Sequence, residues 1–173
     1  MLRPWCSWAK ATPSSGRRDG VGRGPAIVAL GLAAALCACT PRSGQGLPLS
    51  RLDTLVGQAI GDPSTCVLLA DARTGQVVWR YGDAFNCARQ LPACDAPGLM
   101  NATSALAFAA RPGGRMQSCP SVPDGSRTVG WAEGRVQSRT RELIYSAVME
   151  GQKALPGHEI NARLYDAFDK AGL

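Results

Sequence analysis

The clearest pattern of hydrophobic and polar positions lies in residues 65–81, TCVLLADARTGQVVWRY. An apolar run over residues 66–70 meets a turn that contains Gly75, and a second run of β-branched and aromatic residues follows over 77–81. This arrangement predicts a β-hairpin. Because the first run is apolar at every position, we expect a strand that is covered on both faces, around which the core forms.

One amphipathic helix is predicted before the sheet-forming segments in the sequence, and another after them. After Ser50, apolar residues recur at helical spacing over 52–60, and Gly-Asp-Pro at 61–63 ends that pattern. Near the end of the chain, apolar positions over 160–168 follow the same period, and Gly172 is placed to close the helix. Each helix has one apolar face that has to pack on something.

Two further strands are predicted over residues 128–132 and 143–149, joined by a polar turn at 137–141. Residues 95–126 between the two halves are rich in Ala, Pro, Gly and Ser, and only 99–110 has helical propensity. The pattern therefore predicts an α+β fold: an antiparallel sheet with N- and C-terminal helices packed on it, and an irregular, poorly ordered middle segment.

The charge of the chain does not indicate a nucleic-acid partner. The formal net charge is +6, but residues 1–38 hold five basic side chains against one acidic side chain. Residues 39–173 hold 14 Lys and Arg against 12 Asp and Glu, with no basic run. Nucleic-acid binding needs a clustered basic surface, and the sequence of this later part offers none.

The N-terminal segment has the organisation of a bacterial export signal. Basic residues precede an apolar run over residues 25–36, which is too short to span a bilayer. The run ends in Leu-Cys-Ala-Cys at 36–39, which resembles the lipobox of bacterial lipoproteins. That resemblance implies cleavage before Cys39 and attachment of lipid to its thiol. An ordinary signal peptide cut nearby, or an uncleaved anchor, is the alternative.

Export sets the organisation of the rest of the chain. We expect a signal peptide of the lipoprotein type over residues 1–38, a tether over 39–49 and a single domain over 50–173. The predicted location is the bacterial cell envelope, on the periplasmic side of a membrane. The membrane itself is the predicted partner, through the lipid anchor.

An oxidising compartment gives the remaining cysteines a structural role. Four follow Cys39, and they allow two disulfides in three pairings that sequence does not distinguish: Cys66, Cys87, Cys94 and Cys119. Zinc is the rival interpretation, but the chain has no Cys-x-x-Cys pair and one histidine, His158. The sequence therefore predicts neither a metal site nor a cofactor.

Two stretches are similar to the two ends of a known enzyme family. The first is residues 70–94, ADARTGQVVWRYGDAFNCARQLPAC. The second comprises VGWAEG at 129–134, the predicted strand 143–149 and the closing helix over 156–173. Here the chain resembles class D β-lactamases and their penicillin-binding relatives. The resemblance implies the sheet of a serine β-lactamase, with a β-lactam or a peptidoglycan peptide as ligand.

The chain departs from that family where the catalytic residues should stand. There, a serine forms the acyl-enzyme and a lysine three residues later, on the same helix face, serves as base. The only Ser-x-x-Lys here is Ser7–Lys10, in the presequence, and no Lys-Thr-Gly triad precedes the Gly-Trp strand. The family's large helical lobe also has no room. The resemblance therefore implies an internally truncated relative, with a deletion or frame change between about residues 95 and 126.

Four serines of the middle segment are the remaining candidate nucleophiles, and none has a lysine nearby in sequence: Ser104, Ser118, Ser121 and Ser126. We assign no catalytic residue. The sequence favours a lipid-anchored envelope protein without catalytic activity, either a remnant or a binding module. Two alternatives stay open: an acyl-serine enzyme that hydrolyses or is acylated by β-lactams, and an unrelated small disulfide-stabilised periplasmic lipoprotein.

Overall fold

The computed structural model describes residues 46–138 and 141–173. Its elements follow one another as α1 (Leu49–Ile60), β1 (Cys66–Asp71), β2 (Val77–Tyr81), α2 (Ala84–Ala88), β3 (Leu91–Pro92), β4 (Leu99–Met100), α3 (Ala102–Ala109), β5 (Arg115–Pro120), β6 (Thr128–Gln137), β7 (Glu142–Gly151) and α4 (Gly157–Ala171). The predicted signal peptide and Cys39 lie outside the described residues.

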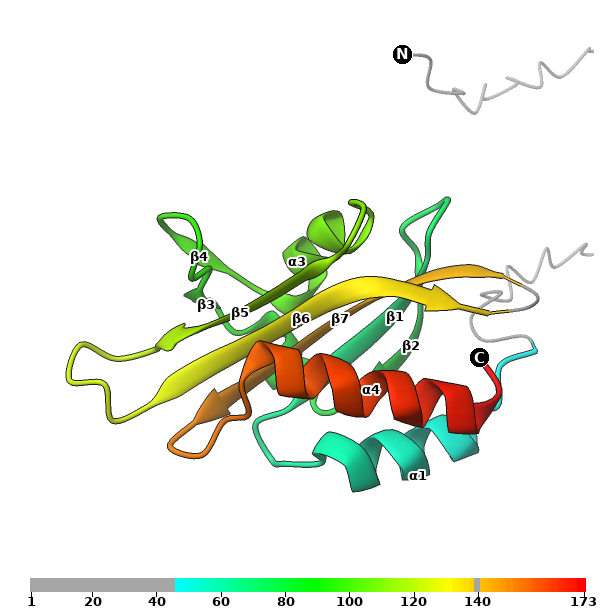
Figure 1. Ribbon diagram of the computed structural model, residues 1–173, viewed down its shortest axis with the longest axis horizontal. Coiled ribbons are helices and arrows are strands. Elements are labelled where there is room, and N and C mark those ends of the chain that lie inside the picture. Colours follow the sequence, from blue (N-terminus) through cyan, green and yellow to red (C-terminus); the bar gives the residue numbers. More distant parts are fainter. Residues whose placement is uncertain (1–45, 139–140) are drawn as a thin grey trace, which may run out of the picture. The chain divides into compact units, whose positions relative to one another are not determined.

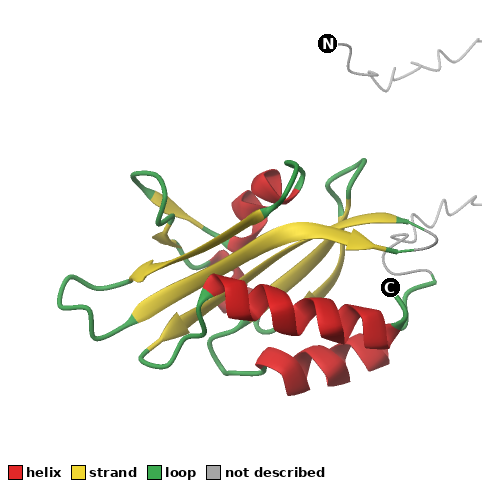
Figure 2. Cartoon of the chain, in the orientation of Figure 1, coloured by secondary structure: helices red, strands yellow, loops and turns green. Residues whose placement is uncertain are grey.

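One five-stranded antiparallel sheet organises the domain, in the order β2-β1-β7-β6-β5. Helices α1 and α4 lie side by side along one face of the sheet, and α3 lies on the other (Figure 1). Figure 2 shows the same layers, with a short β3–β4 ribbon standing apart from the main sheet. The predicted α+β class and the antiparallel sheet with a helix at each end are confirmed.

The hairpin over residues 65–81 forms as predicted, and its first strand is central. Strand β1 pairs with β2 on one side and with β7 on the other. Since side chains alternate along a strand, Val67 and Leu69 face α1 and α4, whereas Leu68 and Ala70 face α3. Both sets are buried, which explains why the β1 sequence is apolar at every position.

The face covered by α1 and α4, called here the helix face, is packed with apolar side chains. Leu52 of α1 and Leu164 and Phe168 of α4 are almost completely buried against the sheet. Tyr145 of β7 contacts Phe168 edge to face, with ring centroids 5.5 Å apart. Burial of these stripes is the main stabilising contribution on this face.

Helix α4 approaches the sheet so closely that its first residue has to be glycine. A Cβ at Gly157 would lie 2.2 Å from the carbonyl oxygen of Trp131 and 2.6 Å from that of Gln117. The Gly157 N–H donates to Ser118 Oγ at 2.8 Å, which ties the start of the helix to β5. The Pro-Gly pair at 156–157 therefore fixes where α4 meets the sheet.

The prediction of an irregular middle segment is wrong. Residues 95–126 contain β4, α3 and β5, and β5 pairs with β6 in the main sheet from Arg115 to Pro120. The helical propensity of 99–110 is realised, because Ala105, Leu106 and Ala109 of α3 pack on the sheet. This segment is ordered by contacts with distant parts of the chain rather than by a regular apolar pattern of its own. Its weak sequence pattern is therefore not evidence for a frame change.

Several predicted boundaries also shift. Strand β6 extends to Gln137 and strand β7 begins at Glu142, so the connection between them is shorter than expected. Helix α1 begins at Leu49 with Pro48 at its N-cap, rather than at Ser50, which places the end of the predicted 39–49 tether inside the domain. Within the described parts of the chain, no helix is long and apolar enough to cross a bilayer.

Candidate functional site

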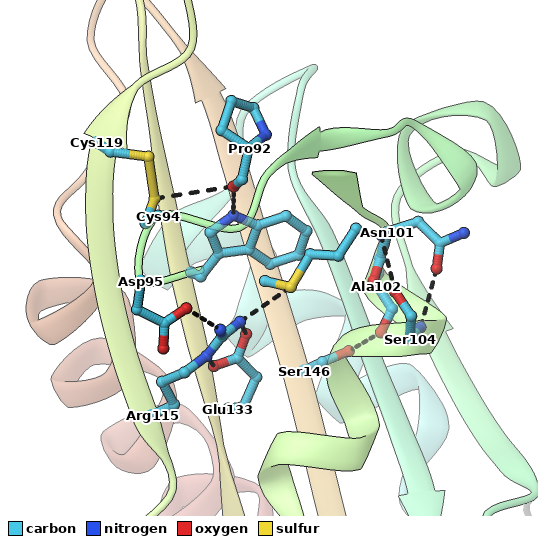
Figure 3. A network of polar contacts seen from close by, with 12 residues as sticks. Pro92, Cys94, Asp95, Asn101, Ala102, Ser104, Arg115, Cys119, Glu133 and Ser146 are labelled. Atoms are coloured by element: carbon cyan, nitrogen blue, oxygen red, sulfur yellow. Dashed lines mark hydrogen bonds and ion pairs between the residues drawn. A yellow bond between two sulfur atoms is a disulfide. The ribbon is translucent and has the colours of Figure 1, made fainter. Parts of the chain in front are cut away.

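Buried polar side chains gather on the sheet face that carries α3, called here the α3 face. Of the five buried polar or charged residues described, Arg115, Glu133, Ser146 and Glu150 have their side chains on this face or in contact with it. Glu133 and Ser146 are 1% and 0% exposed. Figure 3 shows the part of this network between β5, β6 and α3.

A buried ion network centres on Arg115, the first residue of β5. Its Nε and Nη2 donate to the two carboxylate oxygens of Glu133 on β6, at 3.0 and 2.9 Å. Its Nη1 donates to Asp95 Oδ1 at 2.7 Å, and Nη2 also lies 3.0 Å from the sulfur of Met100. The guanidinium carbon Cζ of Arg115 lies over the Phe108 ring of α3, 3.8 Å from the centroid of that ring. All sides of the guanidinium are therefore engaged within the protein.

Glu133 is fixed in an ion pair with Arg115, which does not favour proton transfer. Burial raises the pKa of Glu133, and the hydrogen bonds and charge of Arg115 oppose that shift. Both of its oxygens accept from the same guanidinium, a bidentate geometry that favours a fixed ion pair. No open position at Glu133 is left among these contacts for a reacting group.

The β3–β4 ribbon closes one side of the network. Trp131 Nε1 donates to the Pro92 carbonyl at 2.8 Å, and the Cys94–Cys119 disulfide joins the ribbon to β5 (Figure 3). Cys94 has a φ of 70°, in the left-handed region that residues other than glycine seldom adopt. The ribbon conformation thus depends on contacts with the sheet, which also bring Asp95 to Arg115.

The start of α3 is stabilised by a helix cap. Asn101 Oδ1 accepts from the Ser104 N–H at 2.9 Å, and Ser104 Oγ accepts from the Asn101 N–H at 3.0 Å. This reciprocal pair is a capping box. The Ser146 hydroxyl donates to the Ala102 carbonyl at 2.6 Å and fixes the first turn to β7.

The four candidate serines all make structural hydrogen bonds. Ser104 caps α3, Ser118 accepts from the Gly157 N–H, and Ser126 donates to Asp124 within a turn. Ser121 donates to Glu150 at 2.7 Å. Within residues 46–138 and 141–173, none of the four forms a hydrogen bond with lysine or histidine.

Ser121 comes closest to a hydroxyl–base pair, but Glu150 is a poor base. Arg127 donates two hydrogen bonds of 2.7 Å to the Glu150 carboxylate, and Arg89 donates a third of 2.9 Å. The hydrogen bonds from Arg127 are the largest influence on the pKa of Glu150. Burial acts in the opposite sense, but the hydrogen bonds from Ser121 and Arg89 add to those from Arg127 and the pKa is lowered to about 2. A carboxylate so strongly held in its ionised form does not accept a proton near neutral pH.

The four predicted cysteines form two disulfides, and the structure selects one of the three pairings. Cys66 of β1 bonds to Cys87 of α2, and Cys94 bonds to Cys119 of β5. Each disulfide joins the α3 face of the main sheet to a segment that packs over it. Among the described residues, no group of three or more His, Cys, Asp and Glu side chains is placed to hold a metal ion.

An open groove lies beside β2, between that edge strand and helices α2 and α3. Its walls are formed by Leu68, Val77, Val78, Trp79, Arg80, Ala84, Cys87, Ala88, Asn101 and Thr103. Arg80 is the one ionisable side chain among these described residues, because Cys87 is in a disulfide. The groove therefore lacks an acid–base pair.

The residues that dominate this face were not singled out from the sequence. Glu133 and Glu150 each lie two positions after a buried apolar residue on the same strand face, Trp131 and Val148. A charge that continues an apolar strand face is the signal that could have found them. Comparisons with known proteins add no assignment: no family model, curated protein or solved structure matches this chain.

Proposed function

We propose that this protein is a lipid-anchored envelope protein with a sheet of the serine β-lactamase type and no catalytic activity. The observation that carries the proposal is the state of the α3 face. Its buried charges are paired with one another, and all four candidate serines of the chain make structural hydrogen bonds. Such a face serves as a structural core of a binding module rather than as a reaction centre.

The order of elements supports the resemblance to β-lactamases. A helix and a two-stranded hairpin come first, an insertion carrying α3 follows, and further strands and a closing helix complete the same sheet. The first and last helices pack together on one face, as that resemblance implies. Fold alone does not imply activity, because function depends on the site.

Acyl transfer to a serine requires an activated hydroxyl. The base must lie within hydrogen-bond reach and must be able to take up a proton. The contacts of Ser104, Ser118 and Ser126 provide no such base, and the Ser121 partner Glu150 has its pKa lowered to about 2. We therefore expect no acyl-enzyme with a β-lactam.

Fluorescent penicillin tests the absence of acylation. Purified protein is incubated with the reagent and separated under denaturing conditions, beside a penicillin-binding protein, whose acyl-serine is hydrolysed slowly, as positive control. We expect label on the control and none on this chain, in either the native protein or a Ser104→Ala variant. Label that is present on the native protein and lost in Ser104→Ala would show a reactive serine and overturn the proposal.

Metabolic labelling with radioactive palmitate tests the lipid anchor. We expect incorporation into the native chain and none into Cys39→Ser. Cys37→Ser is the matched control, because it removes a neighbouring thiol and leaves Cys39 in place; it should keep the label. Equal labelling of native chain and Cys39→Ser would exclude lipid attachment at Cys39.

A further inference from the structure

Three exposed arginines lie at one end of the main sheet, called here the basic end. Arg73 is in the β1–β2 turn, Arg111 is in the turn between α3 and β5, and Arg135 is near the end of β6. All three side chains belong to exposed residues. Figure 1 shows these turns at the end of the sheet where β6 ends and β7 begins.

Hydrogen bonds join the turns of the basic end. Arg135 Nη2 donates to the Ala110 carbonyl at 2.9 Å, which links β6 to the α3–β5 turn. The Ala72 N–H donates to the Glu142 carbonyl at 2.9 Å, which links the β1–β2 turn to the start of β7. Because Gln137 of β6 pairs with Glu142 of β7, these hydrogen bonds hold the turns together at one end of the sheet.

None of the three arginines forms a salt bridge among the described residues, although the charge of Arg73 is a minor influence that lowers the pKa of Asp71. Other basic side chains of the domain form salt bridges, including Arg89, Arg115, Arg127, Arg163 and Lys170. Carboxylates near the basic end include Asp71, Glu142 and Asp169, the last of which lines a hollow with Val136 of β6. Asp71 accepts three hydrogen bonds from its own turn, mainly from Thr74, which lower its pKa. Its charge is partly compensated by those donors.

The turns at the opposite end of the sheet carry exposed carboxylates, while Arg89 and Arg127 there are paired with Glu150. These turns carry Asp62, Asp83 and Asp124, all exposed, against the exposed Lys153. Residues 46–138 and 141–173 hold 12 basic and 12 acidic side chains, so this part of the chain is neutral as a whole. The exposed turns at the two ends differ in charge, so an anionic surface would act on the orientation of the domain rather than attract it through net charge.

The chain enters the domain at the basic end. Helix α1 runs antiparallel to α4, since Arg163 of α4 donates to the Ala59 carbonyl near the end of α1. The start of α1 consequently lies near the C-terminus and the β6–β7 turn (Figure 1). Cys39 precedes Gly46 by seven residues, which span at most about 25 Å when fully extended. A lipid on Cys39 therefore keeps Gly46, where the domain begins, within about 25 Å of the bilayer.

We propose that the basic end docks on anionic phospholipid headgroups and orients the domain on the membrane. This proposal rests on the lipid anchor at Cys39. Guanidinium groups pair with phosphate through parallel hydrogen bonds, and arginines close to an anionic leaflet are attracted to it. The acidic turns at the opposite end then point away from the surface, and the groove beside β2 stays open to solvent.

Arginine footprinting on vesicles tests the orientation. The lipidated protein is reconstituted into phosphatidylcholine vesicles, or into vesicles with about 30% phosphatidylglycerol, and treated with a dicarbonyl reagent before mass spectrometry. We expect modification of Arg73 and Arg111 to slow by about fivefold on the anionic vesicles. Arg80, which is exposed on β2, is the internal control and should react at the same rate on both.

Charge reversal provides a matched comparison. Arg73→Glu/Arg111→Glu removes the contact, whereas Arg80→Glu/Lys153→Glu makes the same change in net charge elsewhere on the exposed surface. Footprinting of Arg135 reports on both variants. We expect its protection on anionic vesicles to disappear in the first variant and to persist in the second. Protection should also disappear at roughly 0.5 M salt, because exposed charges are then screened.

The outcomes separate this proposal from the anchor on which it rests. Absence of palmitate on Cys39 would remove the anchor itself. A lipidated protein whose arginines react equally on both kinds of vesicle would keep the anchor and overturn the docking surface. Equal loss of Arg135 protection in both double variants would also overturn it, because the effect would then follow net charge rather than this surface.

Discussion

The two faces of the sheet are built by different physical means. On the helix face, α1 and α4 bury apolar stripes such as Leu52, Leu164 and Phe168. On the α3 face, the covering segments are short, and ion pairs and disulfides hold them in place: Arg115–Glu133, Arg127–Glu150, Cys66–Cys87 and Cys94–Cys119. Long helices supply enough apolar area to stay bound, whereas α2 and α3, with five and eight residues, do not.

This difference explains why the α3 face is easily mistaken for a reaction centre. It contains buried charges and hydroxyls, which elsewhere mark active sites. Here each group has a structural partner, and structural ion-pair networks also perturb pKa values. A polar interior therefore has to be judged by what its groups can still bind, rather than by their presence.

The largest expected effect is at the centre of the α3 face. Glu133→Ala leaves the guanidinium of Arg115 buried without its bidentate partner, which should lower the free energy of unfolding by about 3 to 5 kcal/mol. Urea denaturation with intact disulfides measures the change. Glu159→Ala, which removes an exposed i,i+4 partner of Arg163, is the control and should cost less than about 1 kcal/mol. Equal losses in the two variants would contradict the structural role of Glu133.

A core substitution on the helix face should cost somewhat less. Leu164→Ala removes a fully buried side chain between α4 and the sheet and leaves a cavity, so we expect a loss of about 3 kcal/mol. Chemical denaturation again provides the measurement. Ala162→Gly, at an exposed position of the same helix, controls for helix propensity and should cost about 1 kcal/mol. A loss at Leu164 no larger than this control would mean that α4 packs loosely.

Acid should weaken the α3 face through Glu150. Its pKa is about 2 in the folded protein, below the ordinary value of 4.5. Its contribution is therefore fully present above pH 4.5 to 5 and is lost as the pH falls through about 2. Glu150→Gln should be about 2 kcal/mol less stable than the native chain at pH 7, and this difference should shrink toward pH 2. A difference that stays constant with pH would contradict the charged role of Glu150.

The smallest expected effect is at the cap of α3. Asn101→Ala removes the acceptor for the Ser104 N–H, and the typical cost of losing such a cap is about 1 kcal/mol. Thr103→Ala, at an exposed position in the first turn of α3, is the control and should change stability by less than about 0.5 kcal/mol. Thermal unfolding resolves the two. Identical midpoints would show that the covering contacts alone hold α3.

The contrast between the faces also decides how much of the fold was predictable. The hairpin, the terminal helices and the strands β6 and β7 follow from periodicity, which reports apolar burial. Strand β5 did not, because Arg115 and Cys119 are fixed by partners 18 and 25 residues away, and a one-dimensional pattern does not contain pairing. The disulfide cysteines were identified as a set, but their pairing needed the fold.

The ion network of the α3 face was not predicted from the sequence. That Asp95, Arg115 and Glu133 meet depends on the β3–β4 ribbon, which has two residues in each strand. Local propensity does not specify such a ribbon. The sequence offered one usable signal, a glutamate that continues the apolar face of Val129 and Trp131 along β6.

A double-mutant cycle on Arg115 and Glu133 tests most directly whether the α3 face is a structural polar core. Arg115→Met and Glu133→Leu are made singly and together, and their unfolding free energies are compared. We predict that each single variant is destabilised and that the double variant recovers most of the loss, because an apolar pair can replace a buried ion pair. A double variant that loses the sum of the two single effects would contradict this account.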